Sequence, residues 1–206
     1  MLLLGPLYRF VAAHFATRIN HFPLVRLVFF SVDKMLFYLF VFMVLRAVWG
    51  RLRRQPWHWR HEWKVAGFAG YLMLLLNLTV FRQTYWPWQL TWYWHRNLAA
   101  VNWVPLVETG KLWFGATRFD FWYQSLGNIL WFVPFGWGIQ RLARRPYRLL
   151  GVAVRGAAFS LLIETLQFLL WSGVADIDDV IFNTVGAMVG YGCFQVTRHF
   201  QKHFHA

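Results

Sequence analysis

Acidic side chains and cysteine are both scarce in this chain. Its 206 residues include only 8 Asp and Glu against 21 Lys and Arg, which gives a formal net charge of +13. The single cysteine, Cys193, excludes a disulfide within the chain and leaves the redox compartment undetermined. No G-x-S-x-G, P-loop, Rossmann glycine or H-E-x-x-H pattern occurs, so the sequence carries none of these signatures of hydrolases and nucleotide-binding proteins. The first residues, MLLLGPLYRF, lack a basic n-region and an A-x-A-like site, so we expect no signal peptide.

Hydrophobic and aromatic residues, by contrast, are abundant. They make up 58% and 21% of the chain, with 14 Trp and 21 Phe, while charged residues are held to 14%. The basic residues flank apolar runs and accompany no recognition motif, which argues against a nucleic-acid partner and favours membrane lipids. The composition predicts an all-α, polytopic transmembrane helical bundle in the cytoplasmic (inner) membrane.

Five segments are long and apolar enough to be predicted spans, since a helical span needs ~20 mostly apolar residues. We expect them within a single membrane domain, 1–206, after an interfacial helix in residues 1–22 that Arg9, His14 and Arg18 keep from spanning. The predicted spans are roughly 25–48, 64–81, 123–140, 149–171 and 179–197.

The basic residues predict the orientation of the chain. Eleven Lys and Arg lie in the connections after the first and third spans and after the fifth, which places those connections in the cytoplasm and the N-terminus outside. The long connection 82–122 then lies outside. Its tryptophans, which include Trp86, Trp88, Trp92, Trp94, Trp103 and Trp113, predict an outer loop that either anchors the protein at the interface or covers a site.

Carboxylates and amides concentrate in the outer half of the last three predicted spans. Helical periodicity places Asp176, Asp179 and Asn183 on one face of the fifth, together with Gly186 and Gly190. Glu164, Gln167 and Ser160 share a face of the fourth span, and Gln124 and Asn128 lie in the first turns of the third. An ionisable group costs at least ~2.5–3.5 kcal/mol within a span, so these side chains should face protein or a polar cavity. Glu164 could equally form a structural hydrogen bond to Asn128 or Asn183.

Three aspartates, Asp176, Asp178 and Asp179, open the fifth span. One suffices as a helix N-cap, and the other two would repel it unless a proton, a cation or a basic ligand group intervenes. Oxygen-only donors suit Mg²⁺ or Ca²⁺, so Asp176 and Asp179 are candidate ligands for a divalent cation. His199 and His203, four residues apart, lack a third ligand and are typical of a solvated tail.

In order along the chain, four segments resemble the VanZ-like family of integral membrane proteins: VNWVPL, GNILWFVPFGWGI, IETLQ and ADIDDVIFNTVGAMVGY, within 100–192. The polar residues of these segments are our candidates for ligand binding: Asn102, Asn128, Gln167, Asp176, Asp178 and Asn183. Pro105, Pro134, Gly136, Gly186 and Gly190 are candidates for structural roles, and the G-x-x-x-G spacing of the last two permits close helix approach. The resemblance implies an envelope role linked to teicoplanin susceptibility. One departure is Gly173, which stands where the family usually has an arginine; Arg96, Lys111 or Arg118 would then have to supply the cation.

Three functions are compatible with this pattern. The first is binding of the polar head of an envelope lipid or lipid-linked cell-wall precursor in an outward-facing cavity. The second is a membrane enzyme for lipid head groups, with Glu164 as general base and Asp179 orienting the substrate. The third is a noncatalytic scaffold whose polar residues only join the helices.

Overall fold

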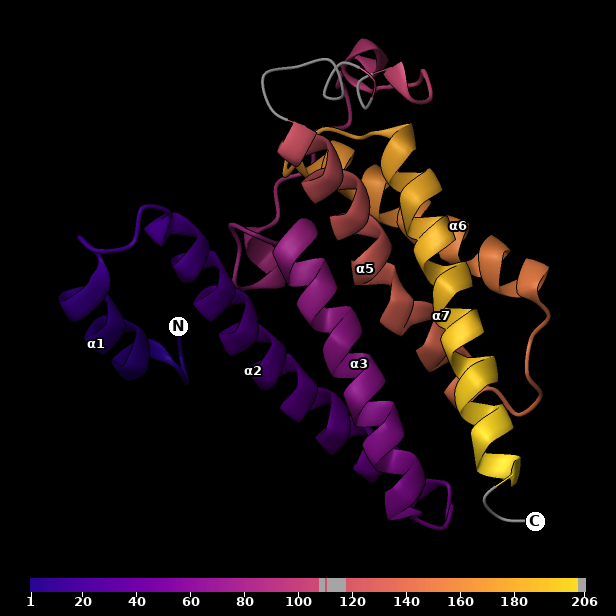
Figure 1. Ribbon diagram of the computed structural model, residues 1–206. Coiled ribbons are helices and arrows are strands. Elements are labelled where there is room, and N and C mark those ends of the chain that lie inside the picture. Colours follow the sequence, from indigo (N-terminus) through magenta and orange to yellow (C-terminus); the bar gives the residue numbers. More distant parts are fainter. Residues whose placement is uncertain (108–109, 111–117, 204–206) are drawn as a thin grey trace. The chain divides into compact units, whose positions relative to one another are not determined.

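The fold is all-α, as predicted. The computed structural model describes residues 1–107, 110 and 118–203, and for 118–124, 202 and 203 the backbone alone. Lys111 and Trp113 and the side chains of Arg118 and Gln124 therefore lie outside the described residues. Within these ranges the only β-type pairing is an isolated parallel bridge between Asn102 and Asp176. The elements are α1 (Gly5–Phe15), α2 (Phe22–Leu52), α3 (Trp59–Thr79), η1 (Pro87–Gln89), η2 (Leu98–Ala100), α5 (Arg118–Leu142), α6 (Leu149–Leu170) and α7 (Ile177–His203) (Figure 1).

Three of the described helices are long and apolar enough to cross a membrane: α2, α6 and residues 177–201 of α7. The other two predicted spans, 64–81 and 123–140, coincide with helices α3 and α5. The observed helices reach up to six residues beyond the predicted bounds, because helices continue past their apolar stretch into polar residues.

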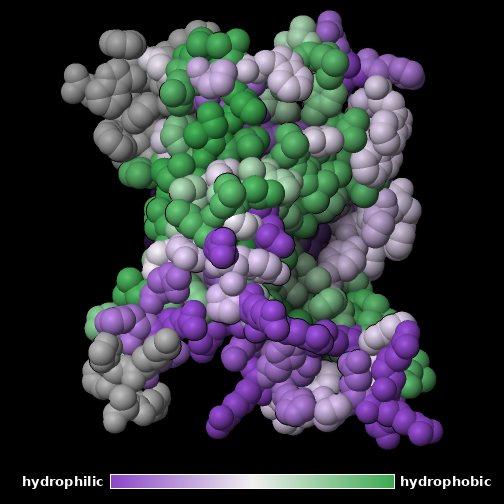
Figure 2. Space-filling view, turned by 90° about the vertical axis from the view of Figure 1, so that its right-hand side faces the viewer, coloured by the Kyte–Doolittle hydropathy of each residue, from purple (hydrophilic) through white to green (hydrophobic). Residues whose placement is uncertain are grey.

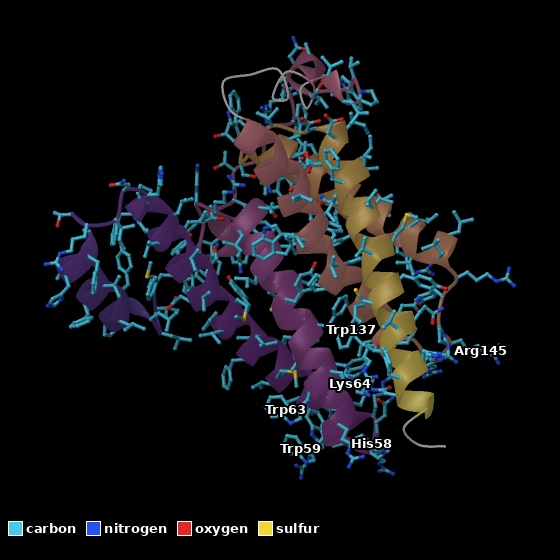
Figure 3. All side chains as sticks on the ribbon, in the orientation of Figure 1. His58, Trp59, Trp63, Lys64, Trp137 and Arg145 are labelled. Carbon is cyan, nitrogen blue, oxygen red and sulfur yellow. The ribbon has the colours of Figure 1, made fainter. Side chains whose placement is uncertain are left out.

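The chain divides into two compact units, Met1–Leu90 and Thr91–Ala206. Unit 1 holds α1, α2, α3 and η1, and its α2 and α3 pack side by side as an antiparallel pair (Figure 1). Its buried polar residues include Ser31, whose hydroxyl donates to the backbone carbonyl of Asn77 at 3.2 Å. At the start of α3, His58, Trp59, Trp63 and Lys64 lie close together (Figure 3). Trp59 and Trp63 are 67% and 71% exposed, which suits residues at a membrane interface.

Unit 2 is built around α7, which packs against both α5 and α6. Its core includes Phe132 and Phe135 of α5, Val152 and Ile163 of α6, and Ala187 of α7. Figure 2 faces the side where α6 and α7 lie, and shows hydrophobic side chains over much of the surface. Four arginines of this unit are exposed in the α5–α6 connection and near the end of α7, namely Arg144, Arg145, Arg148 and Arg198, and Arg155 is exposed within α6.

Glycines set the distance between α5 and α7. A Cβ added to Gly186 would lie 2.2 Å from the carbonyl oxygen of Ile129, and one added to Gly190 would lie 2.1 Å from that of Val133. On the facing helix, a Cβ at Gly136 would lie 1.9 Å from the carbonyl oxygen of Ala187. The backbones therefore touch at three positions, as in small-x-x-x-small packing of membrane helices.

Candidate functional site

The centre of the candidate site is the short segment that leads from α6 into α7. The amide of Asn102 donates to the carbonyl of Ala175 at 2.9 Å, and the amide of Ile177 donates to the carbonyl of Asn102 at 3.1 Å. These two bonds form the bridge between Asn102 and Asp176. They hold Asn102, a residue of the long loop, beside the residues that directly precede α7.

Asp176 directly precedes α7 and caps it, which is the N-cap role that the sequence allowed for one of the three aspartates. Its Oδ1 accepts a hydrogen bond from the amide of Asp178 at 2.8 Å, the geometry of an N-cap. Its own amide donates to Oε2 of Glu164 on α6 at 3.0 Å. Glu164, only 5% exposed, thus anchors the entry of α7 to α6.

A cavity of about 180 Å³ opens at this junction. Glu164, Asp176 and Asn102 supply most of its polar lining, and Thr165 adds a hydroxyl that bonds back to its own helix. The remaining walls are apolar and come from the loop, α6 and α7: Leu98, Val101, Trp103, Leu161, Phe168, Ala175, Ile177 and Val180. The arrangement is amphipathic, with carboxylate and amide groups beside a hydrocarbon surface.

Asn102, a residue of this lining, has a polar atom without a partner. The side-chain nitrogen Nδ2 of Asn102 is buried and makes no hydrogen bond to any residue that the structure describes. Burying an amide without a partner costs roughly 1–3 kcal/mol. Glu164 and Asp176 likewise have no cationic partner within the described ranges, where the one ion pair joins Arg46 to Glu62. The cavity therefore holds unmet capacity both to donate and to accept hydrogen bonds.

A second group of predicted site residues forms contacts between helices instead. Asn128 of α5 donates through Nδ2 to Oδ1 of Asp179 on α7. Asn183 of α7 donates to the hydroxyl of Ser160 on α6 at 2.8 Å. Neither Asp179 nor Asn183 is among the residues that line the cavity. We call Asn128, Asp179, Asn183 and Ser160 the clasp, since they join the three helices of unit 2.

Asp178 of α7 makes another contact with the loop, at the residue that follows Pro105. Leu106, directly after Pro105, has φ of 62°, in the left-handed region that side chains rarely adopt. Its amide donates to Oδ1 of Asp178 at 2.6 Å, and Asp178 is 1% exposed. The aspartate thus stabilises a strained loop residue.

Three residues that the sequence analysis singled out, Gln167, Gly173 and Arg96, lie at the C-terminal end of α6. The side chain of Gln167 lies 3.2 Å from where a Cβ of Gly173 would be, so a side chain at position 173 would require Gln167 to shift. Arg96 donates to the carbonyl of Phe168 at 2.7 Å and stacks over the rings of Phe168 and Trp171. It is therefore a cap for the C-terminus of α6, and within the described residues it pairs with no carboxylate.

The described carboxylates supply only some of the oxygen ligands that a divalent cation needs. Among the described residues, no three His, Cys, Asp or Glu side chains are arranged to hold a metal ion. The assignment of Mg²⁺ or Ca²⁺ to Asp176 and Asp179 stays a prediction, in which a ligand such as a phosphate must supply further oxygens.

Sequence patterns missed the apolar half of the cavity. Leu161 and Phe168 lie on α6 near Glu164, so their side of the helix could have been identified from the wheel. Leu98 and Val101 come from an irregular loop, where no periodicity indicates which side chain faces inward.

Helices able to cross a membrane, with buried carboxylates near the ends of two of them, define an all-α membrane protein. The chain belongs to the VanZ/LLP1 family, whose model matches residues 68–198. It is 30% identical to Protein VanZ of Enterococcus faecium over 125 residues, which cover 59% of this chain and 67% of that protein. The matched region begins in α3, earlier than the motifs at 100–192. No solved structure matches significantly.

Proposed function

We propose that unit 2 binds the polar head group of an envelope lipid, either a phospholipid or a lipid-linked cell-wall precursor, in the cavity formed by Glu164, Asp176 and Asn102. The observation that supports this most is the buried, unpartnered Nδ2 of Asn102 beside two carboxylates that lack a cationic partner among the described residues. A ligand that pairs with all three groups would remove the cost of leaving them unpaired.

The chemistry of the cavity defines the ligand. Carboxylates accept hydrogen bonds from hydroxyl, amide or ammonium groups, and the Asn102 nitrogen donates to an ester, amide or phosphate oxygen. The apolar walls suit the adjoining alkyl chain. A divalent cation bound by Asp176 would additionally bridge to a lipid phosphate.

Binding of the head group to purified protein tests this proposal. Native mass spectrometry of the full chain in detergent, with added phosphatidylethanolamine or phosphatidylglycerol, should show bound lipid. Asn102→Leu should lower the bound fraction about three- to tenfold, the factor of one ordinary hydrogen bond, without lowering thermal stability, because the amide has no protein partner to lose. Thr165→Val, in the same wall, is the matched control and should leave binding unchanged. Equal binding by Asn102→Leu and wild type would remove this cavity from consideration.

A noncatalytic scaffold is the second candidate, and the clasp favours it. Asn128 with Asp179, and Asn183 with Ser160, join three helices without lining the cavity. If the polar residues serve only as scaffold, Glu164→Gln should lower thermal stability and leave lipid binding and antibiotic susceptibility unchanged. If they bind a head group, Glu164→Gln should reduce binding. A link to teicoplanin is tested by the susceptibility of cells that carry this variant in place of wild type.

A further inference from the structure

Unit 1 contains a pocket that is separate from the cavity of unit 2. Its volume is about 330 Å³, within the range of small-molecule sites. Helix α2 contributes Tyr38, α3 contributes Met73, Leu76 and Asn77, and the segment after α3 contributes Phe81, Thr84, Tyr85, Trp86, Pro87 and Leu90. Apart from Asn77, Thr84 and the tyrosine hydroxyls, these side chains are aliphatic, aromatic or, for Met73, a thioether.

Asn77 is the unusual member of this lining. It is 7% exposed, and its backbone carbonyl accepts a hydrogen bond from Ser31. Its side-chain amide makes no hydrogen bond to any residue in the described part of the chain. This amide faces a mostly apolar pocket without a hydrogen-bond partner among the described residues, so an acceptor on a ligand in the pocket would gain a hydrogen bond there.

The wall of the pocket is held in place by other buried groups. Lys34, fully buried on α2, donates to the backbone carbonyls of Phe81 and Thr84. The hydroxyl of Tyr38 donates to the carbonyl of Tyr85 at 2.8 Å. The segment 81–85 is thus fixed over the pocket by two side chains of α2, so the pocket is a built feature of the unit.

The position of the pocket suits the depth in a membrane at which the hydrocarbon core meets the lipid head groups. Asn77 lies two residues before the end of α3, and α3 packs against α2, which is able to cross a membrane. Trp86 and Trp88 follow, stacked with ring centres 5.0 Å apart. Tryptophan is enriched at membrane interfaces, which is also the depth at which a phospholipid carries its acyl ester groups.

From these observations we infer that the pocket binds one acyl chain of a membrane glycerophospholipid, with the Asn77 amide donating to the oxygen of its ester carbonyl. The hydrocarbon lining takes the chain, and the single unpaired amide selects the ester. This second lipid site involves unit 1 alone and does not depend on the head-group cavity of unit 2.

Photo-cross-linking of the full chain tests the inference. The protein is reconstituted in vesicles of phosphatidylglycerol and phosphatidylethanolamine that contain a phosphatidylglycerol with a diazirine in one acyl chain, linked by an ester or by an ether. The ester lipid should label peptides from residues 73–90 about three- to tenfold more than the ether lipid, because an ether lacks the carbonyl acceptor. Asn77→Leu should lower ester labelling to the ether level and abolish the difference. The lipid-free variant should be at least as thermally stable as wild type.

Thr79→Val is the matched control, since Thr79 lies on the same helix but not in the lining, and it should retain the difference. Equal labelling by ester and ether lipids in wild type, or absence of label from 73–90, would overturn the inference. If Asn77→Leu does not fold, Met73→Trp replaces it and should exclude both lipids by filling the pocket. Glu164→Gln should leave this labelling unchanged, which separates failure here from failure of the proposed function.

Discussion

Single glycines determine how closely the helices of unit 2 approach. The G-x-x-x-G spacing of Gly186 and Gly190 was readable in the sequence, and the structure places both against carbonyl oxygens of α5. The reciprocal contact of Gly136 with Ala187 was not readable, because spacing within one helix does not identify the partner residue on another. The left-handed Leu106 also escaped prediction, since leucine gives no signal for a positive φ.

Substituting these glycines should separate packing from helix propensity. Gly186→Ala adds a Cβ 2.2 Å from the Ile129 carbonyl oxygen, so it should destabilise unit 2 by about 1–3 kcal/mol or more through overpacking. Gly192, on the same helix, has nothing within 4 Å of its Cβ position, so Gly192→Ala should stabilise by about 0.5–1 kcal/mol. Thermal unfolding in detergent measures both. Equal effects of the two substitutions would show that the close approach is absent in solution.

At the scale of elements, periodicity and apolar length located all five long helices but not their polar partners. Asp33 was visible only as an interruption of the first predicted span. In the structure its carboxylate accepts hydrogen bonds from the amides of Leu2, Leu3 and Leu4 at 2.8, 2.7 and 2.6 Å, and from the hydroxyl of Tyr85 at 2.8 Å. Such partners are distant in sequence, so no local pattern indicates them.

Loss of this carboxylate should therefore release the N-terminal segment. Asp33→Asn removes the charge that four donors share, and hydrogen bonds to charged groups contribute about 1.5–3 kcal/mol each. We expect a lower unfolding temperature and faster proteolysis within residues 1–20. Asp178→Asn, in unit 2, is the comparison: it should destabilise the loop at Leu106 and leave proteolysis of residues 1–20 as in wild type.

The Tyr85 hydroxyl should make the stability of unit 1 depend on pH in the alkaline range. Burial, followed by its hydrogen bond to the Asp33 carboxylate, raises the pKa of the Tyr85 hydroxyl well above its usual value. Because the folded state holds this proton more tightly than the unfolded state, the stabilisation is complete below about pH 10 and is lost as pH rises through the folded pKa. Unfolding temperatures between pH 9 and 12 should fall less steeply in Tyr85→Phe than in wild type. Parallel curves would show that neither burial nor the bond to Asp33 raises the pKa of this hydroxyl in the folded protein.

For the whole molecule, composition and charge were the most informative properties. Together they predicted a helical membrane protein, and the family match agrees with that class. They also predict an orientation, since the exposed basic residues of the α2–α3 and α5–α6 connections should face the cytoplasm. The described connection between α6 and α7, which holds Asp176, contains no Lys or Arg and should face outward.

Cysteine labelling in intact cells tests this orientation. Cys193 is exposed and is first replaced by serine. Single cysteines are then placed at exposed positions, Gln55→Cys between α2 and α3, Ala99→Cys in the long loop and Val174→Cys between α6 and α7. A membrane-impermeant maleimide should label positions 99 and 174 on intact cells, and position 55 only after permeabilisation. A cell-wall precursor outside the membrane can reach the carboxylates of unit 2 only from that side. Labelling of position 55 alone on intact cells would place Glu164 and Asp176 toward the cytoplasm and exclude such a precursor as their ligand.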